Sequence, residues 1–552
     1  MCVCVYIIIV MTVGLFVALI AIVIKFVLDF EYIPNLVPIE SVKNKYFDYI
    51  IIGAGTAGSV LAYELSKNAS NSVLLIEAGG IFNGLSIIPL ASTLMQGSQM
   101  DWSFKTVPQK DSSRGLENEQ QSIPRGKGLG GSHSLNYLLH YNGIKNDFDQ
   151  WTRLGADDWN YDNLKYFLNR HDVDCNEGNC GVYVNGNETD FPQLSILKVN
   201  RKKSELAETF MNAYDELKAI KDVNYKLARF TIKNGKRHSV FHEYLRRSMK
   251  RKNLKIMIHA KVLKIEFNDK KEATSVLIST QSEVSKVLVR KEIILSAGTI
   301  HSPQILQLSG IGNKHELKKL GINDVHHLPE VGHNLFDHLN FPLFVSINTS
   351  ASVTKEKILS VREIYRYLMK GDGILSTTAV IGLGLFQDHG IILFGMGSAD
   401  EETLKNVANY KTHSFRSFFP LYANSGQEGF VPLSTCYLPK SRGVIQLDSN
   451  NVLADPLIDP KYLNNYDDVI CMRKAVRLVV ETIATKAFQK LGAQIHWPQL
   501  NECLNFGPFD KDFETNYPSD RYLDCLIRHG AVTAHHPGGT CAIGSVIDNE
   551  LR

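Results

Sequence analysis

The sequence lacks an excess of charge of either sign. Its 552 residues include 60 basic and 57 acidic side chains, which gives a formal net charge of +3. Nucleic-acid-binding domains usually carry a clear basic excess, so this balance provides no electrostatic case for a nucleic-acid partner. Lysine and arginine do gather in "NRKKS" and "LRRSMKRKNLK". We interpret these two stretches as solvated helix faces.

The sequence also lacks the Cys-x-x-Cys pairs of structural zinc sites, and we expect no metal site. Seven of its nine cysteines follow the first 24 residues, and some of them can pair in an oxidising compartment. Cys175 and Cys180, in "CNEGNC", are a local candidate pair. The odd count leaves at least one thiol free.

Charged residues are absent from Val3 to Ile24. A helix of about 22 apolar residues would span a bilayer core of roughly 30 Å. Residues 1–30 are therefore predicted to be either a cleaved signal peptide or a transmembrane signal-anchor, and the sequence leaves both open. Either one places the chain in the secretory path, as a secreted or membrane-anchored glycoprotein that meets the membrane only through this segment. Sequons at Asn68, Asn187 and Asn348 agree with this.

A strand–turn–helix–strand pattern follows in "FDYIIIGAGTAGSVLAYELSKNASNSVLLIEAGG". Gly53, Gly55 and Gly58 form Gly-x-Gly-x-x-Gly between a buried strand and a helix, and Glu77 ends the next buried strand. The first glycine permits the tight turn, the second lets the backbone approach a pyrophosphate, and the third lets helix and strand pack closely. The free N–H groups of the helix N-terminus suit the phosphates, and the acid suits ribose hydroxyls. This context predicts a dinucleotide site.

Two later blocks extend this unit. "RGKGLGGSHSLNYLLHYNG" (125–143) is too rich in glycine for an ordinary helix or strand, and suits a backbone that lies against a ligand. "EIILSAG" reads as a buried strand, and "SPQILQLSG" as a helix with Ser302 as N-cap and Pro303 at the first helical position. The alternating segments "LKIMIHAKVLKIEFN" and "SVLIST" predict antiparallel strands before this block. The nucleotide-binding unit is therefore interrupted and then resumed.

Together these blocks, with "VGHNLFDH", "PKSRGVIQL", "SDRYLDC" and "HHPGGTCAIG", resemble the glucose–methanol–choline (GMC) oxidoreductase family from about Phe47 onward, especially its insect glucose-dehydrogenase-like members. The resemblance implies an α+β fold: a Rossmann-like FAD-binding domain and a substrate domain built on an antiparallel sheet. It implies a discontinuous FAD-binding domain over 46–335, with an inserted helical and loop segment at about 145–225. A substrate-binding domain over 336–530 follows, and 531–552 begin the return to the FAD domain.

The resemblance also assigns cofactor positions along the chain. The pyrophosphate turn falls on Gly53, Gly55, Thr56, Ala57 and Gly58, and the ribose acid falls on Glu77. Trp102 matches the residue that covers part of the cofactor, and the loop beside the flavin contains Gly128, Gly130, Gly131, Ser132 and Asn136. Val262 matches the adenine contact, and the position near the ribose and pyrophosphate falls on Ala297 and Gly298.

The same resemblance places His536, in "HPGGTC", at the active-site position. Alcohol oxidation needs a base for the hydroxyl proton while hydride leaves carbon for the flavin, and an imidazole suits that role near neutral pH. The expected partners are a small-molecule alcohol, such as a sugar or sterol, and an electron acceptor, either oxygen or a quinone. His535 is expected to point away and satisfy a local hydrogen bond.

The sequence departs from the family pattern at its end. The family supplies a second active-site residue, His or Asn, and a last nucleotide-binding strand well after the first histidine, but only 16 residues follow His536 here. A C-terminal truncation is therefore expected, with apolar neighbours of the missing strand left exposed. Three interpretations stay open: an incomplete sequence of an active enzyme, a decayed relative that binds FAD poorly, or a catalytically silent secreted FAD- or ligand-binding protein.

Overall fold

The computed structural model describes residues 35–170, 172–175, 192–281, 283–420, 424–506 and 518–552. The predicted signal or anchor segment, residues 1–30, lies outside these residues, as do Cys180 of the predicted cysteine pair and the sequon at Asn187. Within the described part of the chain, no helix is both long enough and apolar enough to cross a membrane.

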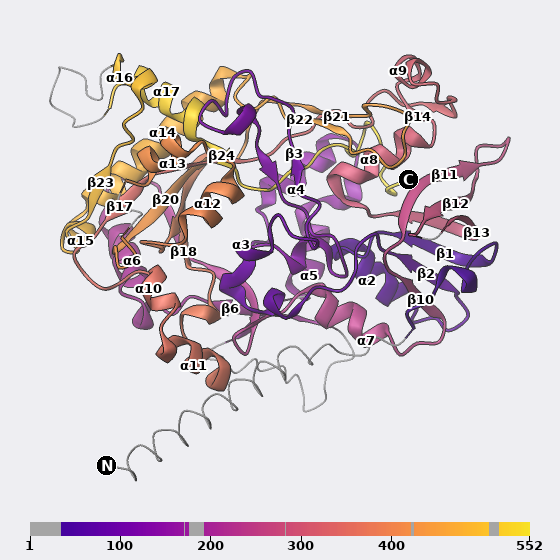
Figure 1. Cartoon of the computed structure of the whole chain (residues 1–552), viewed down its shortest axis with the longest axis horizontal. Coiled ribbons are helices and arrows are strands. Elements are labelled where there is room, and N and C mark those ends of the chain that lie inside the picture. Colours follow the sequence, from indigo (N-terminus) through magenta and orange to yellow (C-terminus); the bar gives the residue numbers. More distant parts are fainter. Residues whose placement is uncertain (1–34, 171, 176–191, 282, 421–423, 507–517) are drawn as a thin grey trace, which may run out of the picture.

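One sheet has six strands in the order β10-β2-β1-β13-β12-β11. Its strands are β1 (Tyr46–Ile52), β2 (Val73–Ile76), β10 (Leu254–Met257), β11 (Lys261–Phe267), β12 (Ala273–Ser279) and β13 (Val284–Leu295). The first four strands of this order run parallel, and β12 and β11 add an antiparallel extension. This is the interrupted and resumed nucleotide-binding unit that the sequence predicts, and it lies on the right in Figure 1.

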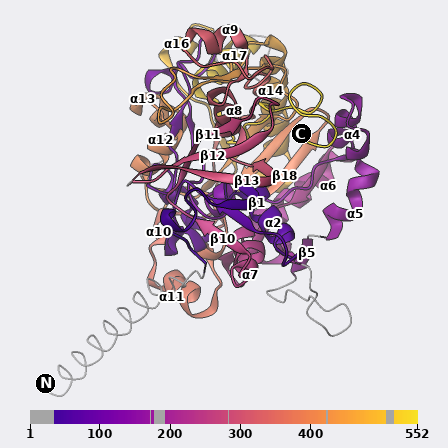
Figure 2. The ribbon, with the colours of Figure 1, turned by 90° about the vertical axis from the view of Figure 1, so that its right-hand side faces the viewer.

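The second half of β1, Tyr49–Ile52, is a continuous apolar run because the sheet is covered on both faces there. Ile51 packs on one face with Ala62 of α2 (Thr56–Leu65) and Met249, next to α7 (Arg246–Ser248). Ile50 and Ile52 pack in another cluster with β11–β13 and with Ile305 of α8 (Gly298–Leu308). Figure 2 looks onto this end of the molecule, where β11, β12, β13 and β1 follow one another down the view.

The second sheet is antiparallel and has eight strands in the path β23-β17-β20-β19-β18-β7, with β16 paired to both β20 and β24. The strands are β7 (Asn224–Leu227), β16 (Leu339–Pro342), β17 (Phe344–Ser346), β18 (Val380–Phe386), β19 (His389–Phe394), β20 (Gly429–Cys436), β23 (Gln494–His496) and β24 (Val532–Thr533). The α+β fold class is thus confirmed. The predicted domain limits stay a prediction, and β7 joins this sheet from before residue 336.

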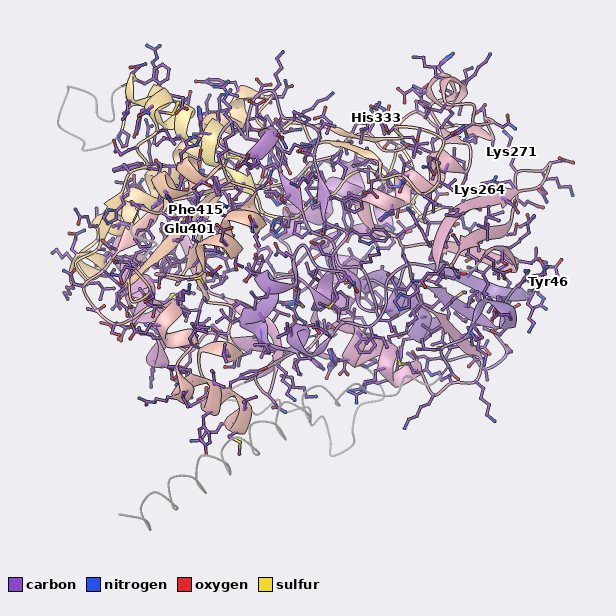
Figure 3. The ribbon with its side chains drawn as sticks, viewed as in Figure 1. Tyr46, Lys264, Lys271, His333, Glu401 and Phe415 are labelled. Carbon is purple, nitrogen blue, oxygen red and sulfur yellow. A yellow bond between two sulfur atoms is a disulfide. The ribbon has the colours of Figure 1, made fainter. Side chains whose placement is uncertain are left out.

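Alternation along β19 gives the second sheet two different faces. Ile391 and Leu393 lie in the largest apolar cluster, under α6 (Glu205–Leu217), α14 (Tyr466–Ala484) and α17 (Asp520–Gly530). Ile392 and Phe394 point the other way and line a cavity. In Figure 3, Phe415 of α13 (Thr412–Phe418) lies in this unit, whereas Tyr46, Lys264 and Lys271 mark the outer edge of the first sheet.

Shorter elements connect and flank the two units. They are α3 (Ser92–Met95), β3 (Phe104–Lys105), β4 (Ser122–Ile123), α4 (Lys145–Arg153), α5 (Tyr161–Arg170), β5 (Asp172–Cys175), β6 (Leu194–Lys198), β8 (Arg229–Lys233), β9 (Lys236–Arg237), β14 (Ile311–Gly312), α9 (Lys314–Lys319), β15 (His326–His327), α10 (Lys355–Ile358), α11 (Val361–Lys370), α12 (Glu401–Ala408), β21 (Val444–Gln446), β22 (Leu457–Asp459), α15 (Lys486–Gln489) and α16 (Asn501–Leu504).

The predicted start of the helix at Ser302 is wrong. The helix α8 begins at Gly298, and Pro303 lies inside it. A proline has no N–H for the carbonyl four residues earlier, which here belongs to Thr299. The Thr540 hydroxyl donates to that carbonyl at 2.6 Å. A side chain from the far end of the chain therefore supplies the bond that the proline removes, and the helix starts directly after β13.

The C-terminal end of β13 pairs with a described strand on one side only. Residues 292–295 pair with β1 on one side, and none of the described strands pairs with them on the other. Ile293, Ile294 and Leu295 are half-buried, whereas Ile50 to Ile52 of the neighbouring strand are buried.

Two disulfides lie in the second unit. Cys436 at the end of β20 bonds Cys471 of α14, and Cys503 of α16 bonds Cys525 of α17. Cys541 is a free thiol, and burial raises its pKa to about 12. The first bond ties the sheet to its longest covering helix across 35 residues of chain.

We predict that replacing both Cys436 and Cys471 with alanine lowers the free energy of unfolding by about 3–4 kcal/mol, because the cross-link restricts the unfolded chain. Thermal unfolding without reductant measures this as a lower melting temperature. Cys541→Ala is the matched control and should melt near the wild type. Equal melting temperatures for the double variant and the control would contradict the prediction.

Candidate active site

The predicted glycine turn lies between β1 and α2. Gly53 has φ +97°, and a Cβ on Gly58 would stand 2.0 Å from the Gly53 carbonyl oxygen, so both positions require glycine. A Cβ on Gly55 would meet no atom within 4 Å, so the space in front of this backbone is open. Thr56 and Ala57 open α2, whose free N–H groups face the same end. The turn therefore has the shape that a diphosphate needs.

Glu77 follows β2 and is 7% exposed. Its carboxylate accepts hydrogen bonds from Ala54 N and Gly79 N, both at 2.9 Å. Burial raises its pKa, and the backbone donors counteract that rise. Glu77 therefore fixes the glycine turn to the next strand, and the ribose contact expected for it stays a prediction.

The second glycine block lies on the first. Gly130 N donates to the Ala54 carbonyl at 2.8 Å, and a Cβ on Gly131 would stand 2.7 Å from Gly55 Cα. Ser132 and Asn136, at the end of this loop, line the cavity of the second sheet. The loop therefore connects the dinucleotide turn to the cavity.

Trp102 lies beside the start of β11, away from that cavity. Its ring is 4.2 Å from the His301 ring, with Lys127 Nζ 4.5 Å and Lys261 Nζ 5.9 Å from its centroid. Lys261 and Lys127 directly precede Val262 and Gly128, two other predicted cofactor positions. Burial, with the two lysines, lowers the pKa of His301 to about 3, and its Nε2 has no partner among the described residues. The sequence prediction assigned no role to His301, because the Trp102 ring that it contacts lies about 200 residues earlier in the chain.

Ala297 and Gly298 join the glycine turn to the histidine loop. Ser296, just before them, donates its hydroxyl to the Gly53 carbonyl at 3.1 Å. Thr299, just after them, donates its hydroxyl to the Pro537 carbonyl at 2.9 Å. The residue that follows His536 is therefore tied to the first turn of α8, which starts at Gly298 beside the glycine turn. Two motifs more than 480 residues apart (53 and 536) meet at one place.

The cavity itself has a volume of about 380 Å³. His535 and His536 both line the cavity, together with Ser132, Asn136 and Asn340. Most other lining side chains are aliphatic or aromatic, among them Leu135, Leu138, Leu139, Phe344, Val380, Ile392, Phe394, Met396, Phe415, Phe419, Val431 and Leu433. Three separate segments of the chain, 93–139, 340–433 and 532–536, therefore form its wall.

His536 is exposed to the cavity and held through its backbone. Its N–H donates to Asp337 Oδ1 at 2.7 Å, and its Nδ1 lies 3.2 Å from His338 Nδ1. Desolvation by the surrounding protein, and then the nearby His338, lower the pKa of His536 to about 4, so the imidazole is neutral at pH 7. A neutral imidazole facing a cavity is what a base for a hydroxyl proton requires. Its role as base stays a prediction.

The prediction that His535 points away is wrong. His535 lines the same cavity, and its ring lies nearly parallel to that of Tyr137 at 6.4 Å. Its carbonyl, rather than its ring, makes the local bond, accepting from Arg125 Nη2 at 2.7 Å. Burial lowers the pKa of His535 to about 3. A left-handed backbone, with φ +65°, turns both rings toward the cavity.

Asp337 and His338 are functional residues to which sequence reasoning assigned no role. They close the block "VGHNLFDH", directly before β16. Asp337 is 5% exposed and binds the backbone of His536. The local indication of a role was an acid followed by a histidine directly before a strand. The hydrogen-bond partners of both residues lie about 200 residues further along the chain.

Comparison with known proteins supports this description. The GMC oxidoreductase N-terminal model matches residues 47–340, and the C-terminal model matches 439–552. Because the second match reaches residue 552, the comparisons do not support the expected truncation.

Relatives match over most of the chain. The Drosophila melanogaster "Neither inactivation nor afterpotential protein G" is 41% identical, over 94% of this chain and 86% of the relative. The Bombyx mori ecdysone oxidase is 30% identical, over 92% of this chain and 76% of the relative. The Drosophila pseudoobscura glucose dehydrogenase [FAD, quinone] is 28% identical, over 92% and 80%.

Solved structures share the fold. A formate oxidase superposes with a TM-score of 0.75 at 21% identity, covering 92% of each chain. A pyridoxine 4-oxidase gives 0.71 at 22% identity, covering 92% of this chain and 91% of its own. The chain belongs to the GMC oxidoreductase family, whose members bind FAD and act on CH–OH substrates.

Proposed function

We propose that this protein oxidises the CH–OH group of an apolar alcohol, with His536 as the base that takes the hydroxyl proton. The observation that carries the proposal is the contact between Thr299 and Pro537, which brings the His536 loop to the start of α8, directly after Ser296, which bonds the glycine turn. FAD, when bound, supplies the group that accepts the hydride. We expect oxygen or a quinone as the final electron acceptor.

Different residues of this chain serve cofactor binding, substrate placement and proton transfer. The open backbone at Gly55 and Gly298, neither of which has an atom within 4 Å of a built Cβ, leaves room for the cofactor phosphates. Ser132 and Asn136 lie between that turn and the cavity. His536 is neutral at pH 7, so it can receive a proton when the hydroxyl is placed against it. His535 and Tyr137 close the wall beside it.

The cavity wall favours an apolar substrate over a sugar. Its volume of about 380 Å³ falls in the range of roughly 300–1,000 Å³ that holds drug-sized ligands. A sugar carries hydroxyls on every side, and each one left unpaired against apolar side chains costs about 1–3 kcal/mol. The polar lining groups, which include Gln96, Arg125 and Asn340, are outnumbered by apolar ones and can orient one end of an apolar molecule. A sterol alcohol fits this description.

We predict that His536→Ala slows reduction of the bound flavin by an alcohol about 10²–10⁴-fold, because the hydroxyl proton then has no acceptor. Anaerobic stopped-flow absorbance of the flavin measures this, and the same spectrum checks that FAD is retained. His326→Ala, at an exposed histidine of β15, is the control and should react like the wild type. Unchanged reduction in H536A would refute the base. No reduction of the wild type by any alcohol would favour the catalytically silent alternative.

A second prediction concerns substrate class. The kcat/KM for a sterol alcohol should exceed that for glucose by about 100-fold or more, from two or more sugar hydroxyls left unpaired. Leu433→Asn, which adds a polar group to the wall, should reduce this ratio. Val284→Asn, at an exposed strand position, should leave it unchanged. A higher kcat/KM for glucose than for the sterol would contradict the apolar assignment.

We further propose that the chain enters the secretory path. The support is the pair of disulfides together with the exposed sequon positions Asn68 and Asn348.

For protein secreted from insect cells, enzymatic removal of N-glycans should lower the apparent mass, and N68Q/N348Q should reduce that shift. Asn268→Gln, outside any sequon, is the control. Full-length protein recovered without glycan and with reduced cysteines would overturn this localisation.

A further inference from the structure

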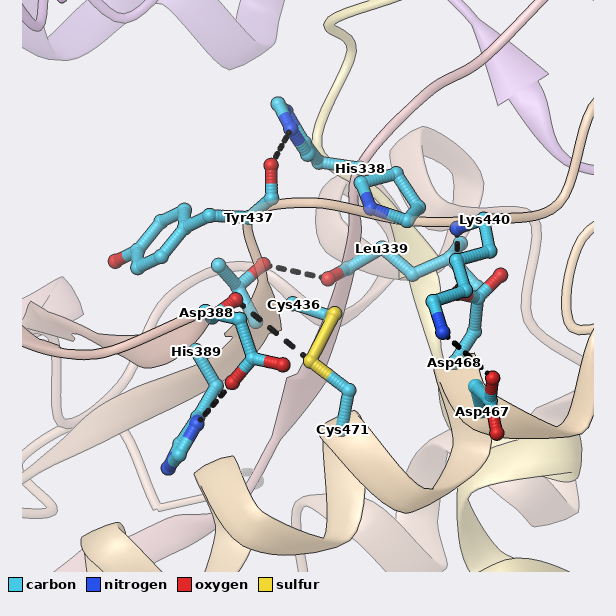
Figure 4. The surroundings of a disulfide bond; sticks show 12 residues. His338, Leu339, Asp388, His389, Cys436, Tyr437, Lys440, Asp467, Asp468 and Cys471 are labelled. Atoms are coloured by element: carbon cyan, nitrogen blue, oxygen red, sulfur yellow. Dashed lines mark hydrogen bonds and ion pairs between the residues drawn. A yellow bond between two sulfur atoms is a disulfide. The ribbon is translucent and has the colours of Figure 1, made fainter. Parts of the chain in front are cut away.

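His338 lies directly behind the proposed base. It precedes β16, and its Nδ1 is 3.2 Å from His536 Nδ1. Its other nitrogen, Nε2, is 3.1 Å from the main-chain carbonyl oxygen of Tyr437, the residue after β20. Figure 4 shows this second contact, with the His338 ring standing over the Tyr437 carbonyl near the Cys436–Cys471 disulfide. The ring therefore has one partner on each nitrogen.

A single carboxylate fixes the backbone of both histidines. Asp337 Oδ1 accepts from the main-chain N–H groups of His338 and His536, at 2.8 and 2.7 Å. Its Oδ2 accepts from the hydroxyls of Tyr462 and Thr533, at 2.6 and 2.5 Å. The carboxylate contacts the backbone of the histidines and leaves their ring nitrogens free for each other.

The hydrogen-bond partners fix where the protons lie. A carbonyl oxygen can only accept, so His338 donates from Nε2–H to Tyr437. A neutral imidazole has one N–H, so His338 Nδ1 then carries a lone pair and must accept. The proton in the contact between the two rings therefore belongs to His536 Nδ1. That leaves His536 Nε2 without a proton, and among the described residues this nitrogen has no hydrogen-bond partner.

We infer that His338 is a positioning residue that fixes His536 as its Nδ1–H tautomer, so that the lone pair on Nε2 is the one offered to the substrate hydroxyl. This inference rests on the proposed function. It adds a second histidine to the site from within the chain, through a carbonyl–histidine–histidine relay of Tyr437, His338 and His536.

The relay also has a role after proton transfer. When the hydroxyl O–H bond breaks and its proton joins Nε2, His536 becomes a cation. Its Nδ1–H then makes a charge-assisted bond to His338 Nδ1, which is stronger than the neutral bond. The other charged groups facing His536 are Asp337, which favours the cation, and Arg125, which opposes it. Since Asp337 bonds only the backbone N–H of His536, His338 is the acceptor that contacts the His536 ring.

The test compares substitutions that keep or remove the acceptor at the His338 Nδ1 position. His338→Asn places an amide oxygen near that position and should keep the rate of flavin reduction within about threefold of wild type. His338→Phe keeps the ring but removes the acceptor, and should slow reduction about 10–100-fold, as loss of an orienting partner does in metal-bound histidines. His326→Phe is the matched surface control.

Two further readouts separate positioning from a merely structural role. His338→Asp should move the acid limb of the kcat/KM profile to higher pH, because a carboxylate stabilises protonated His536. In ¹⁵N-histidine-labelled holoenzyme above that limb, His536 should show a protonated Nδ1 and an unprotonated, pyridine-type Nε2, assigned by its loss in H536A.

The outcomes separate this inference from the proposed function. A protonated Nε2 in the wild type, or H338F reacting as fast as H338N, would overturn the relay while leaving His536 as base. Loss of activity in H338F with folding and FAD content intact, together with rescue in H338N, would support it. If H536A reacts like the wild type, the proposed function fails first, whatever the His338 variants do.

Discussion

The carboxylate of Asp337 is the constraint on which the geometry of the site depends. It is 5% exposed, and four donors surround it: two hydroxyls and two main-chain N–H groups. A charge buried this far needs such donors, and removing any one of them would leave it poorly compensated. Burial, and then the carboxylate itself, raises the pKa of Tyr462 well above its ordinary value, so Tyr462 stays a donor. Asp337 thereby fixes the start of β16 and the histidine loop together.

A second set of contacts carries this arrangement to the nucleotide sheet. The Thr299 hydroxyl of α8 donates to the Pro537 carbonyl, and the Thr540 hydroxyl donates to the Thr299 carbonyl. The helix α8 begins where β13 meets the glycine turn. Within α8, Thr540 donates to the Thr299 carbonyl that Pro303 cannot bond. The glycine turn, the helix and the two histidines thus form one connected structure, and the apolar face of the second sheet closes it. Figure 1 shows how far apart in the chain these segments begin, from indigo to yellow.

The sequence was sufficient where the signal was local. Buried parallel strands, the glycine turn and the acid after β2 follow from runs of neighbouring residues, and each lies where predicted. The sequence failed where a distant group decided the outcome. Pro303 was read as a helix start because its substitute donor, Thr540, lies 237 positions further on. Asp337 and His338 were assigned no role for the same reason. The orientation of the His535 ring was predicted wrongly, because a pair of adjacent histidines does not indicate a left-handed backbone.

The central claim is that the glycine turn, α8 and His536 make a single site for FAD and an alcohol. A crystal structure of the protein with FAD and an unreactive analogue of an apolar alcohol tests it most directly. We predict the diphosphate at Gly53–Gly58, the flavin ring beside Ser132, and the analogue's oxygen within roughly 2.6–3.2 Å of His536 Nε2. A flavin bound elsewhere, or an analogue held with its oxygen away from both His535 and His536, would contradict it.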